Sequence, residues 1–150
     1  MSEHRAHISW QRDGADFGYE SYPRDHDWRF GTGSSLRASA AHEYRGNPAL
    51  PNPEEALVGA LSSCHMLTFL AIAARKGLTV DAYEDEAVGH LEKNAEGRLA
   101  VTRVLLRPRV RFAGQAPDAA ALAALHESAH RGCFIANSVK TDVRVEPPEG

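Results

Sequence analysis

The chain has 150 residues, of which 43% are hydrophobic and 25% are charged, and its net charge is -3. This length predicts a single domain, 1–150, that is large enough to bury a core. The slightly acidic charge argues against a protein that binds nucleic acid or a membrane surface, because both functions need a basic face. Arg107, Arg109 and Arg111 recur at every second position, which predicts the solvent-exposed face of a strand.

The first ten residues contain no apolar run and no small-residue cleavage site, so we expect no signal peptide and a cytoplasmic protein. The most apolar window, 56–74, is interrupted by the polar run 62–65 and is followed at once by Arg75. Because a bilayer span needs about 20 apolar residues, we expect a buried helix here instead. Without an export signal, two cysteines are more typical of catalytic or inert thiols than of a structural disulfide.

The N-terminal third is expected to form a hairpin followed by a loop. Strands are predicted at 5–12 and 18–30, joined by a polar turn around Asp13-Gly14. The segment 31–53 is rich in Gly, Ser, Ala, Asn and Pro, and we expect it to be loop apart from a short strand near 35–38.

The clearest helix start in the chain comes next. Asn52 is a good N-cap, Pro53 occupies the first helical position, and Glu55 follows the cap by three residues, as in a capping box. The helix should run to about Lys76 and end at Gly77. Apolar residues fill two neighbouring stripes along it, which predicts a helix that is buried on most of its surface.

The C-terminal half is expected to contain a hairpin, a second helix and a last strand. The hairpin should turn at 94–97, and the second helix should open at Pro117-Asp118 and end at Gly132. The expected strands are 79–92, 98–112 and 139–145. This order of elements predicts an α+β domain whose helices pack on antiparallel sheet.

Cys64 is the first residue that could carry chemistry. A free cysteine is commonly a small buried hydrophobe, and that interpretation stays open. Polar neighbours Ser62, Ser63 and His65 interrupt a helix otherwise dominated by alanine and leucine, which favours a reactive thiol. His65 should not act as its base, because adjacent helical positions do not face each other; we expect a packing or interface residue.

A reactive thiol needs a cation nearby, since the thiolate is the nucleophilic form. Arg24 is our candidate for that cation, and Arg12 and Arg29 are competitors that spacing alone does not exclude. Cys133, directly after the second helix, is the candidate resolving thiol. It could condense with a sulfenic acid on Cys64 to form a disulfide.

Residues 126–130 offer a rival interpretation. They read His-Glu-Ser-Ala-His, which matches the H-E-x-x-H pattern of zinc hydrolases, with His126 and His130 as ligands and Glu127 as base. No third histidine follows, and a five-residue pattern recurs by chance in a helix rich in His and Glu. We therefore rank a zinc site below the thiol chemistry.

These segments together resemble the OsmC/Ohr superfamily, the osmotically inducible and organic-hydroperoxide-resistance proteins. The resemblance rests on 52–57 (NPEEAL), 60–64 (ALSSC) and 132–138 (GCFIANS), and it covers nearly the whole chain in element order. Residues 22–28 also look like the Tyr-x-Arg-x-His-x-Trp segment of an OsmC-like group within the superfamily.

The resemblance implies an OsmC-like fold, with antiparallel sheets packed with a long central helix, in an intertwined homodimer with its active sites at the subunit interface. It implies that Cys64 is peroxidatic, that Cys133 is resolving, and that Glu54 and an arginine, matched by Arg24, complete the site. It further implies no metal or organic cofactor, organic hydroperoxides as substrates, and a dithiol or lipoylated protein as reductant. Phe134 departs from the proline that the family often has after the second cysteine.

Helix geometry supports the dimer. Glu54 and Cys64 are ten residues apart, so a straight helix separates them by about 15 Å. If both act in one site, the helix bends or the two residues come from different subunits. We thus expect a cysteine-based peroxidase in which each site needs the dimer. The alternative is a non-enzymatic dimer that binds a small hydrophobic ligand, with packed cysteines.

Overall fold

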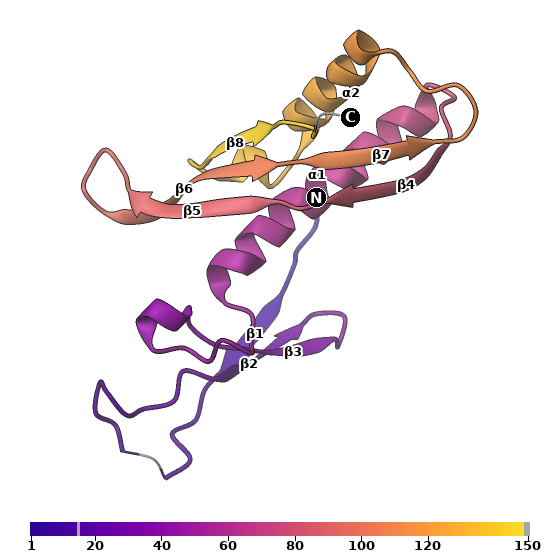
Figure 1. Ribbon diagram of the computed structural model, residues 1–150. Helices are drawn as coiled ribbons and strands as arrows, with labels where there is room; N and C mark the ends of the chain where they lie inside the picture. Colours follow the sequence, from indigo (N-terminus) through magenta and orange to yellow (C-terminus); the bar gives the residue numbers. More distant parts are fainter. Residues whose placement is uncertain (15, 149–150) are drawn as a thin grey trace. The chain divides into compact units, whose positions relative to one another are not determined.

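The computed structural model describes residues 1–14 and 16–148, and these form two compact units, Met1–Ala56 and Leu57–Gly150. The first unit contains a small sheet and a short helix, and the second contains the remaining strands and most of the helical residues (Figure 1). The mixture of helices with mainly antiparallel sheet confirms the predicted α+β class.

The first unit is built on an antiparallel sheet in the order β1-β2-β3, in which Trp28 lies between Ile8 and Leu36. Its elements are β1 (Ala6–Ser9), β2 (His26–Phe30), β3 (Ser35–Ala38) and the 3-10 helix η1 (His42–Tyr44). The strand predicted at 35–38 is confirmed, but the strand predicted at 18–30 begins only at His26. The carbonyl of Gly18 accepts the N–H groups of Ser21 and Tyr22, which makes a turn of the preceding segment.

The long helix α1 (Pro53–Arg75) begins and ends as its sequence predicts. Asn52 Oδ1 accepts the N–H of Glu55 at 2.9 Å, and Asn52 Nδ2 donates to Glu55 Oε1 at 2.7 Å. At the other end Gly77 adopts a φ of +76°, and the N–H of Leu78 returns to the carbonyl of Ala73. This left-handed glycine cap stops the helix at the expected place.

The prediction that α1 is buried on most of its surface is wrong for the single chain. Its buried residues form one stripe at every fourth position: Leu61, His65, Phe69 and Ala73. Only 22% of its most apolar window is buried, and Leu67, on another face, is 61% exposed. By length and mean hydropathy alone α1 would pass for a membrane span, but core helices pass the same test. The sequence predicted an apolar helix correctly. It did not predict how small a part of the helix surface is buried by the rest of the same chain.

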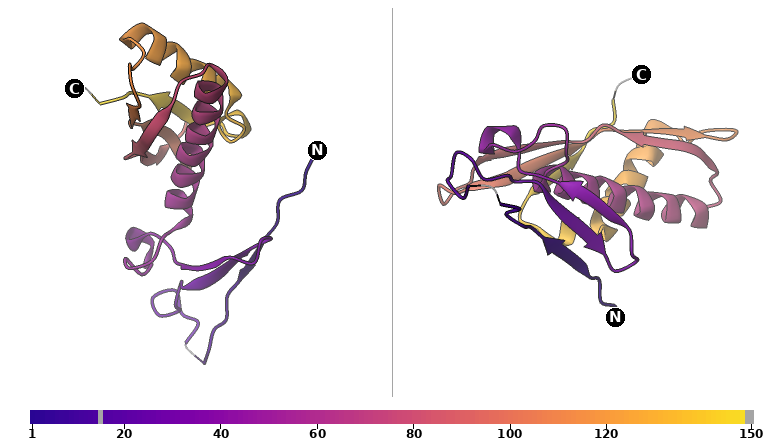
Figure 2. Two further views of the ribbon diagram at one scale, coloured as in Figure 1. Left: turned by 90° about the vertical axis from the view of Figure 1, so that its right-hand side faces the viewer. Right: turned by 90° about the horizontal axis from the view of Figure 1, so that it is seen from below.

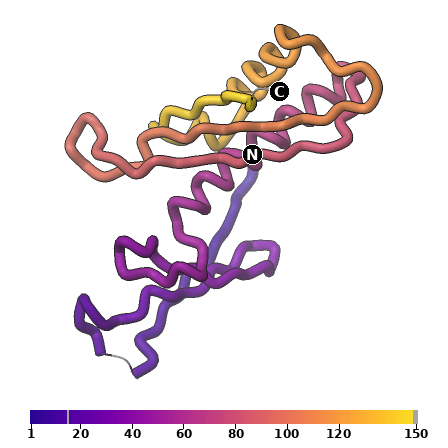
Figure 3. The backbone as a smooth tube through the Cα atoms, in the orientation of Figure 1, coloured from indigo at the N-terminus to yellow at the C-terminus, as the bar shows by residue number. Residues whose placement is uncertain are grey.

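The second unit is organised by one long hairpin (Figure 3), and the two strands predicted for it are each divided in two. The strands are β4 (Val80–Asp85), β5 (Val88–Lys93), β6 (Leu99–Leu106), β7 (Pro108–Phe112) and β8 (Asp142–Val145). β4 pairs with β7, β5 pairs with β6, and β8 joins β6 in parallel. Arg107 lies between β6 and β7, and its N–H donates to Asp85 Oδ1 at 2.7 Å. At this point of the hairpin a side chain replaces a backbone carbonyl as the hydrogen-bond acceptor.

Two apolar clusters hold the second unit together. In one, Leu61 packs with β6 and β8 through Leu106 and Val143. In the other, Phe69 meets Leu125 of helix α2 (Ala119–Gly132), which Asp118 caps by accepting the N–H of Ala121 at 2.8 Å. The hairpin and α2 both contribute to the packing around the Leu57–Arg75 part of α1 (Figure 2). The second helix therefore ends at a fixed place beside α1.

Candidate functional site

The two thiols of the chain lie next to each other in the second unit. Cys64 is half-buried in the middle of α1, Cys133 is 1% exposed at the C-terminal cap of α2, and both are free. Burial raises the pKa of Cys133, and the hydrogen bond and charge of Cys64 raise it further, whereas the N–H of Ala136, 3.4 Å from the sulfur, lowers it. Cys133 is therefore held as a neutral thiol beside Cys64.

The close approach of the two helices depends on Gly132. A Cβ at this position would lie 3.1 Å from Cγ2 of Thr68, which is closer than most carbon contacts. Thr68 cannot move away freely, because its hydroxyl donates to the carbonyl of Cys64 at 2.9 Å. A residue without a side chain thus lets the end of α2 come up to the helical turn that follows Cys64. From the sequence, Gly132 was predicted only to end the helix.

A pair of buried histidines joins the same two helices. Nε2 of His65 lies 3.0 Å from Nδ1 of His126, and the two rings stack with centroids 5.3 Å apart. Burial lowers the pKa of His65 to about 4, with a further lowering by His126 and His130. Burial also lowers the pKa of His126, although Asp85 raises it. The expectation that His65 is a packing residue is confirmed, but its partner lies 61 residues away.

The same contacts leave the zinc alternative without support. Glu127, the expected base, is exposed and paired with Arg131 at 2.8 Å. Within residues 1–14 and 16–148, no group of three or more His, Cys, Asp or Glu side chains could hold a metal ion. The match to H-E-x-x-H therefore reflects packing at His126 and a surface ion pair at Glu127.

Arg24 is fixed in the first unit by backbone and aromatic contacts. Its guanidinium donates to the carbonyl of Tyr22 at 2.5 Å and to that of Tyr19 at 2.7 Å. It also lies 3.6 Å from the centre of the Tyr22 ring and 5.1 Å from that of Tyr19. In the part of the chain that the structure describes, no carboxylate pairs with it, so its charge is available to an anionic group.

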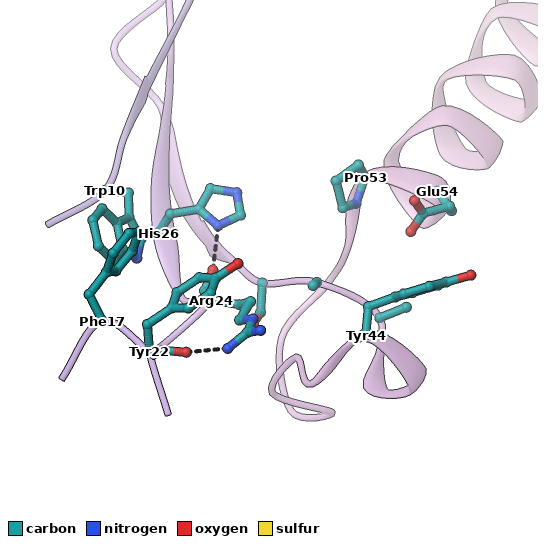
Figure 4. A pocket seen from close by; sticks show the side chains of 11 residues that line it. Trp10, Phe17, Tyr22, Arg24, His26, Tyr44, Pro53 and Glu54 are labelled. Carbon is teal, nitrogen blue, oxygen red and sulfur yellow. Dashed lines mark hydrogen bonds between the residues drawn. The ribbon is translucent and has the colours of Figure 1, made fainter. Parts of the chain in front are cut away.

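A cavity of about 430 Å³ opens beside Arg24 (Figure 4). Four aromatic side chains form part of its lining: Trp10, Phe17, Tyr22 and Tyr44. Glu54, in the first turn of α1, lines the same cavity, whereas the competing Arg12 and Arg29 do not. The structure thus brings Arg24 and Glu54 to one cavity, although no ion pair between them is found among the described residues.

His26 positions the backbone of Arg24. Its Nδ1 lies 2.8 Å from the carbonyl of Arg24 (Figure 4), and its Nε2 accepts the indole N–H of Trp28 at 2.9 Å. These two bonds require a neutral ring with its proton on Nδ1. No role was predicted for this histidine or for the aromatic lining. The alternation of Tyr22, Arg24 and His26 was the only signal for them in the sequence.

The fold and the site together define a small α+β protein with two neighbouring free thiols. The model of the OsmC-like protein family matches residues 46–147, and this chain belongs to that family. The solved structures agree. An OsmC-like protein of unknown function from Vibrio cholerae is 47% identical, with a TM-score of 0.93, and the match covers 99% of this chain and 100% of that one.

More distant relatives share the fold. The organic hydroperoxide resistance protein OsmC of Legionella pneumophila is 16% identical, with a TM-score of 0.71 over 99% of this chain and 98% of that one. The organic hydroperoxide resistance protein OhrB of Bacillus subtilis is also 16% identical, with a TM-score of 0.63 over 96% and 98%. No curated protein matches the chain. These two likenesses show that the chain shares its fold with both proteins.

Proposed function

We propose that this protein is a cysteine-based peroxidase that reduces organic hydroperoxides, and hydrogen peroxide by the same route. The observation that carries the proposal is the pair of free thiols, in which Cys64 is partly accessible and Cys133 is buried beside it. Because the buried thiol is kept neutral, the accessible one is the better nucleophile. Membership of the OsmC-like family supports the same chemistry.

The reaction balances through these two residues. The Cys64 thiolate attacks the terminal oxygen of the hydroperoxide, the O–O bond breaks, and the alkoxide takes up a proton and leaves as an alcohol. Cys64 is then a sulfenic acid. The sulfur of Cys133 attacks it, a disulfide forms, and the oxygen leaves as water. An external dithiol, either a small molecule or a lipoylated protein, reduces the disulfide and restores both thiols.

Arg24 and Glu54 would complete the site. The guanidinium is held rigidly and lacks a carboxylate partner among the described residues, so it suits a thiolate or a developing alkoxide. Glu54 lines the same cavity and would orient the guanidinium once substrate is bound. The aromatic walls would receive the organic part of the substrate.

We further propose that the active protein is a homodimer. An uncovered stripe of α1, which includes Ala60, Leu67, Ala71 and Ala74, would be desolvated by a second copy. The helix is continuous from Pro53 to Arg75. Glu54 and Cys64 therefore lie about 15 Å apart along one copy and would act together only across two. We expect the dimer to work in the cytoplasm.

The test is hydroperoxide consumption with dithiothreitol as reductant. Cys64→Ser should lower the turnover of cumene hydroperoxide by on the order of a thousandfold, because the nucleophile is lost. The matched variant Cys133→Ser should keep the first turnover and then lose activity as Cys64 over-oxidises. Unchanged turnover in Cys64→Ser would refute the proposal. The aromatic cavity would then favour the second candidate, a dimer that binds a small hydrophobic ligand without chemistry.

A further inference from the structure

A second cavity, of about 400 Å³, lies in the second unit, and neither thiol lines it. Residues of α2 and β8 form most of its wall. The wall is largely aliphatic, with Leu122, Ala123, Val143 and Val145. Its volume and apolar character are typical of a site for a small organic molecule.

Two of the residues that line this cavity are histidines with a buried, unpartnered ring nitrogen. His126 lines it and is only 4% exposed, and its Nδ1 is occupied by His65. Its Nε2 is buried and has no hydrogen-bond partner, and the same holds for Nδ1 of His130, which also lines the cavity. A buried polar atom without a partner costs free energy and calls for a specific explanation. A bound group that reaches Nε2 of His126 would remove this cost.

The hydrogen-bonding groups and charges of the lining residues indicate which class of ligand fits the cavity. Burial keeps His126 neutral at physiological pH, so its Nε2 either donates or accepts one hydrogen bond, depending on the tautomer. The carboxylate at the edge, Glu127, is already paired with Arg131. Among the described residues that line the cavity, none is a lysine or arginine that would bind an anion. A hydroxyl group suits the site because it can both donate to and accept from an imidazole.

We propose that this cavity binds a small alcohol, with its apolar body against the aliphatic wall and its hydroxyl group on Nε2 of His126. The proposal is independent of the peroxidase function, since it uses neither thiol and none of the residues around Arg24. His65 would act as a positioning residue, because its bond to Nδ1 fixes which tautomer His126 presents to the ligand.

The experiment follows the histidine ring resonances of the ¹⁵N-labelled full chain during titration with 1-octanol. We expect saturable shifts at the Nε2 resonance of His126. Octanoate, which is charged, should bind about tenfold more weakly. 1-Methoxyheptane, which can accept but not donate a hydrogen bond, should bind as weakly as octanoate where Nε2 is an acceptor, and as well as 1-octanol where Nε2 is a donor. Absence of a saturable shift would mean that the cavity holds water only. Equal binding of all three probes would mean that it does not select a hydroxyl group. Either result would overturn the proposal.

Two variants test the place of binding. His126→Phe keeps an aromatic ring against Phe69 but removes Nε2, and it should weaken 1-octanol binding about tenfold. Because His126 is buried and the variant could lose its fold, Ala123→Leu is the second test. Ala123 is exposed on α2, so leucine should fill the cavity mouth while the fold persists. His42→Phe, a surface substitution in the first unit, is the matched control. Affinity equal to wild type in a folded Ala123→Leu would contradict the proposal.

Discussion

The two units of this chain differ in the charge of their polar groups. In the first unit, the guanidinium of Arg24 and the carboxylate of Glu54 line one cavity. Two backbone carbonyls accept hydrogen bonds from the guanidinium. In the second unit burial suppresses charge: it raises the pKa of Cys133 and lowers that of His65 and His126. The nucleophile thus belongs to a unit with an uncharged interior, and the cation that could activate it belongs to the other. On the proposed mechanism, each unit would supply part of the catalytic machinery, Cys64 from one and Arg24 from the other.

Among variants that keep both thiols, the largest effect should come from removing the charge of Arg24 in the first unit. Arg24→Met should lower kcat/KM for cumene hydroperoxide by about a hundredfold, the usual scale for a lost electrostatic contact to the transition state. Arg45→Met is the matched control, because Arg45 also lies near the ring of Tyr19, at 5.6 Å, but pairs with Glu20 on the surface. Steady-state kinetics measure both. Equal losses in the two variants would mean that the proposed role of Arg24 is wrong.

A second prediction concerns the uncharged interior of the second unit. The folded-state pKa of His65, about 4, lies below the ordinary value of 6.5, so the unfolded chain binds more protons between these values. Stability from this group is therefore complete above about pH 6.5 and is lost as the pH falls toward 4. We expect a loss of roughly 3 kcal/mol in the free energy of unfolding over this range.

Urea unfolding at a series of pH values measures this loss. His65→Phe keeps the ring stacking but cannot take up a proton, so its stability should fall less steeply than that of wild type over the same range. Acidic groups elsewhere contribute equally to both proteins and cancel in the difference. Parallel pH profiles for the two proteins would contradict a neutral, buried His65.

A smaller effect is expected where the two helices meet. Gly132→Ala would place a methyl group against Thr68, so the variant should lose about 1 kcal/mol of stability, although alanine is the better helix former. The disulfide between Cys64 and Cys133 should also form more slowly. Thr68→Ser removes the crowding methyl and keeps the hydroxyl, so the double variant should recover both properties. Failure of this rescue would show that the contact does not position the thiols.

Local signals in the sequence predicted much of the fold. The cap at Asn52, the glycine at 77 and the turn at 94–97 depend on hydrogen bonds between neighbours in the chain, and the structure contains all three. The division of the hairpin was missed because it depends on the Asp85 side chain bonding to Arg107, 22 residues away. Pairing over such a distance leaves no periodic pattern.

The candidate site was predictable only in part. Cys64, Cys133, Glu54 and Arg24 were predicted as site residues from residue type and family resemblance, and their roles stay a prediction. The structure places them as two pairs, one in each unit. The bond between His65 and His126 and the aromatic lining arise from tertiary packing, which brings distant residues together. The exposure of Leu67 was missed for a related reason, since an apolar helix has the same sequence whether its own chain or a second copy covers it.

The most direct test of the central claim is complementation between two inactive variants. Cys64→Ser and Arg24→Met, carrying different tags, are co-expressed, and the mixed dimer is purified for hydroperoxide turnover. If each site combines Cys64 of one copy with Arg24 of the other, a mixed dimer holds one intact site and should regain about half of the wild-type activity. A mixed dimer as inactive as both parents would contradict a site shared between two copies.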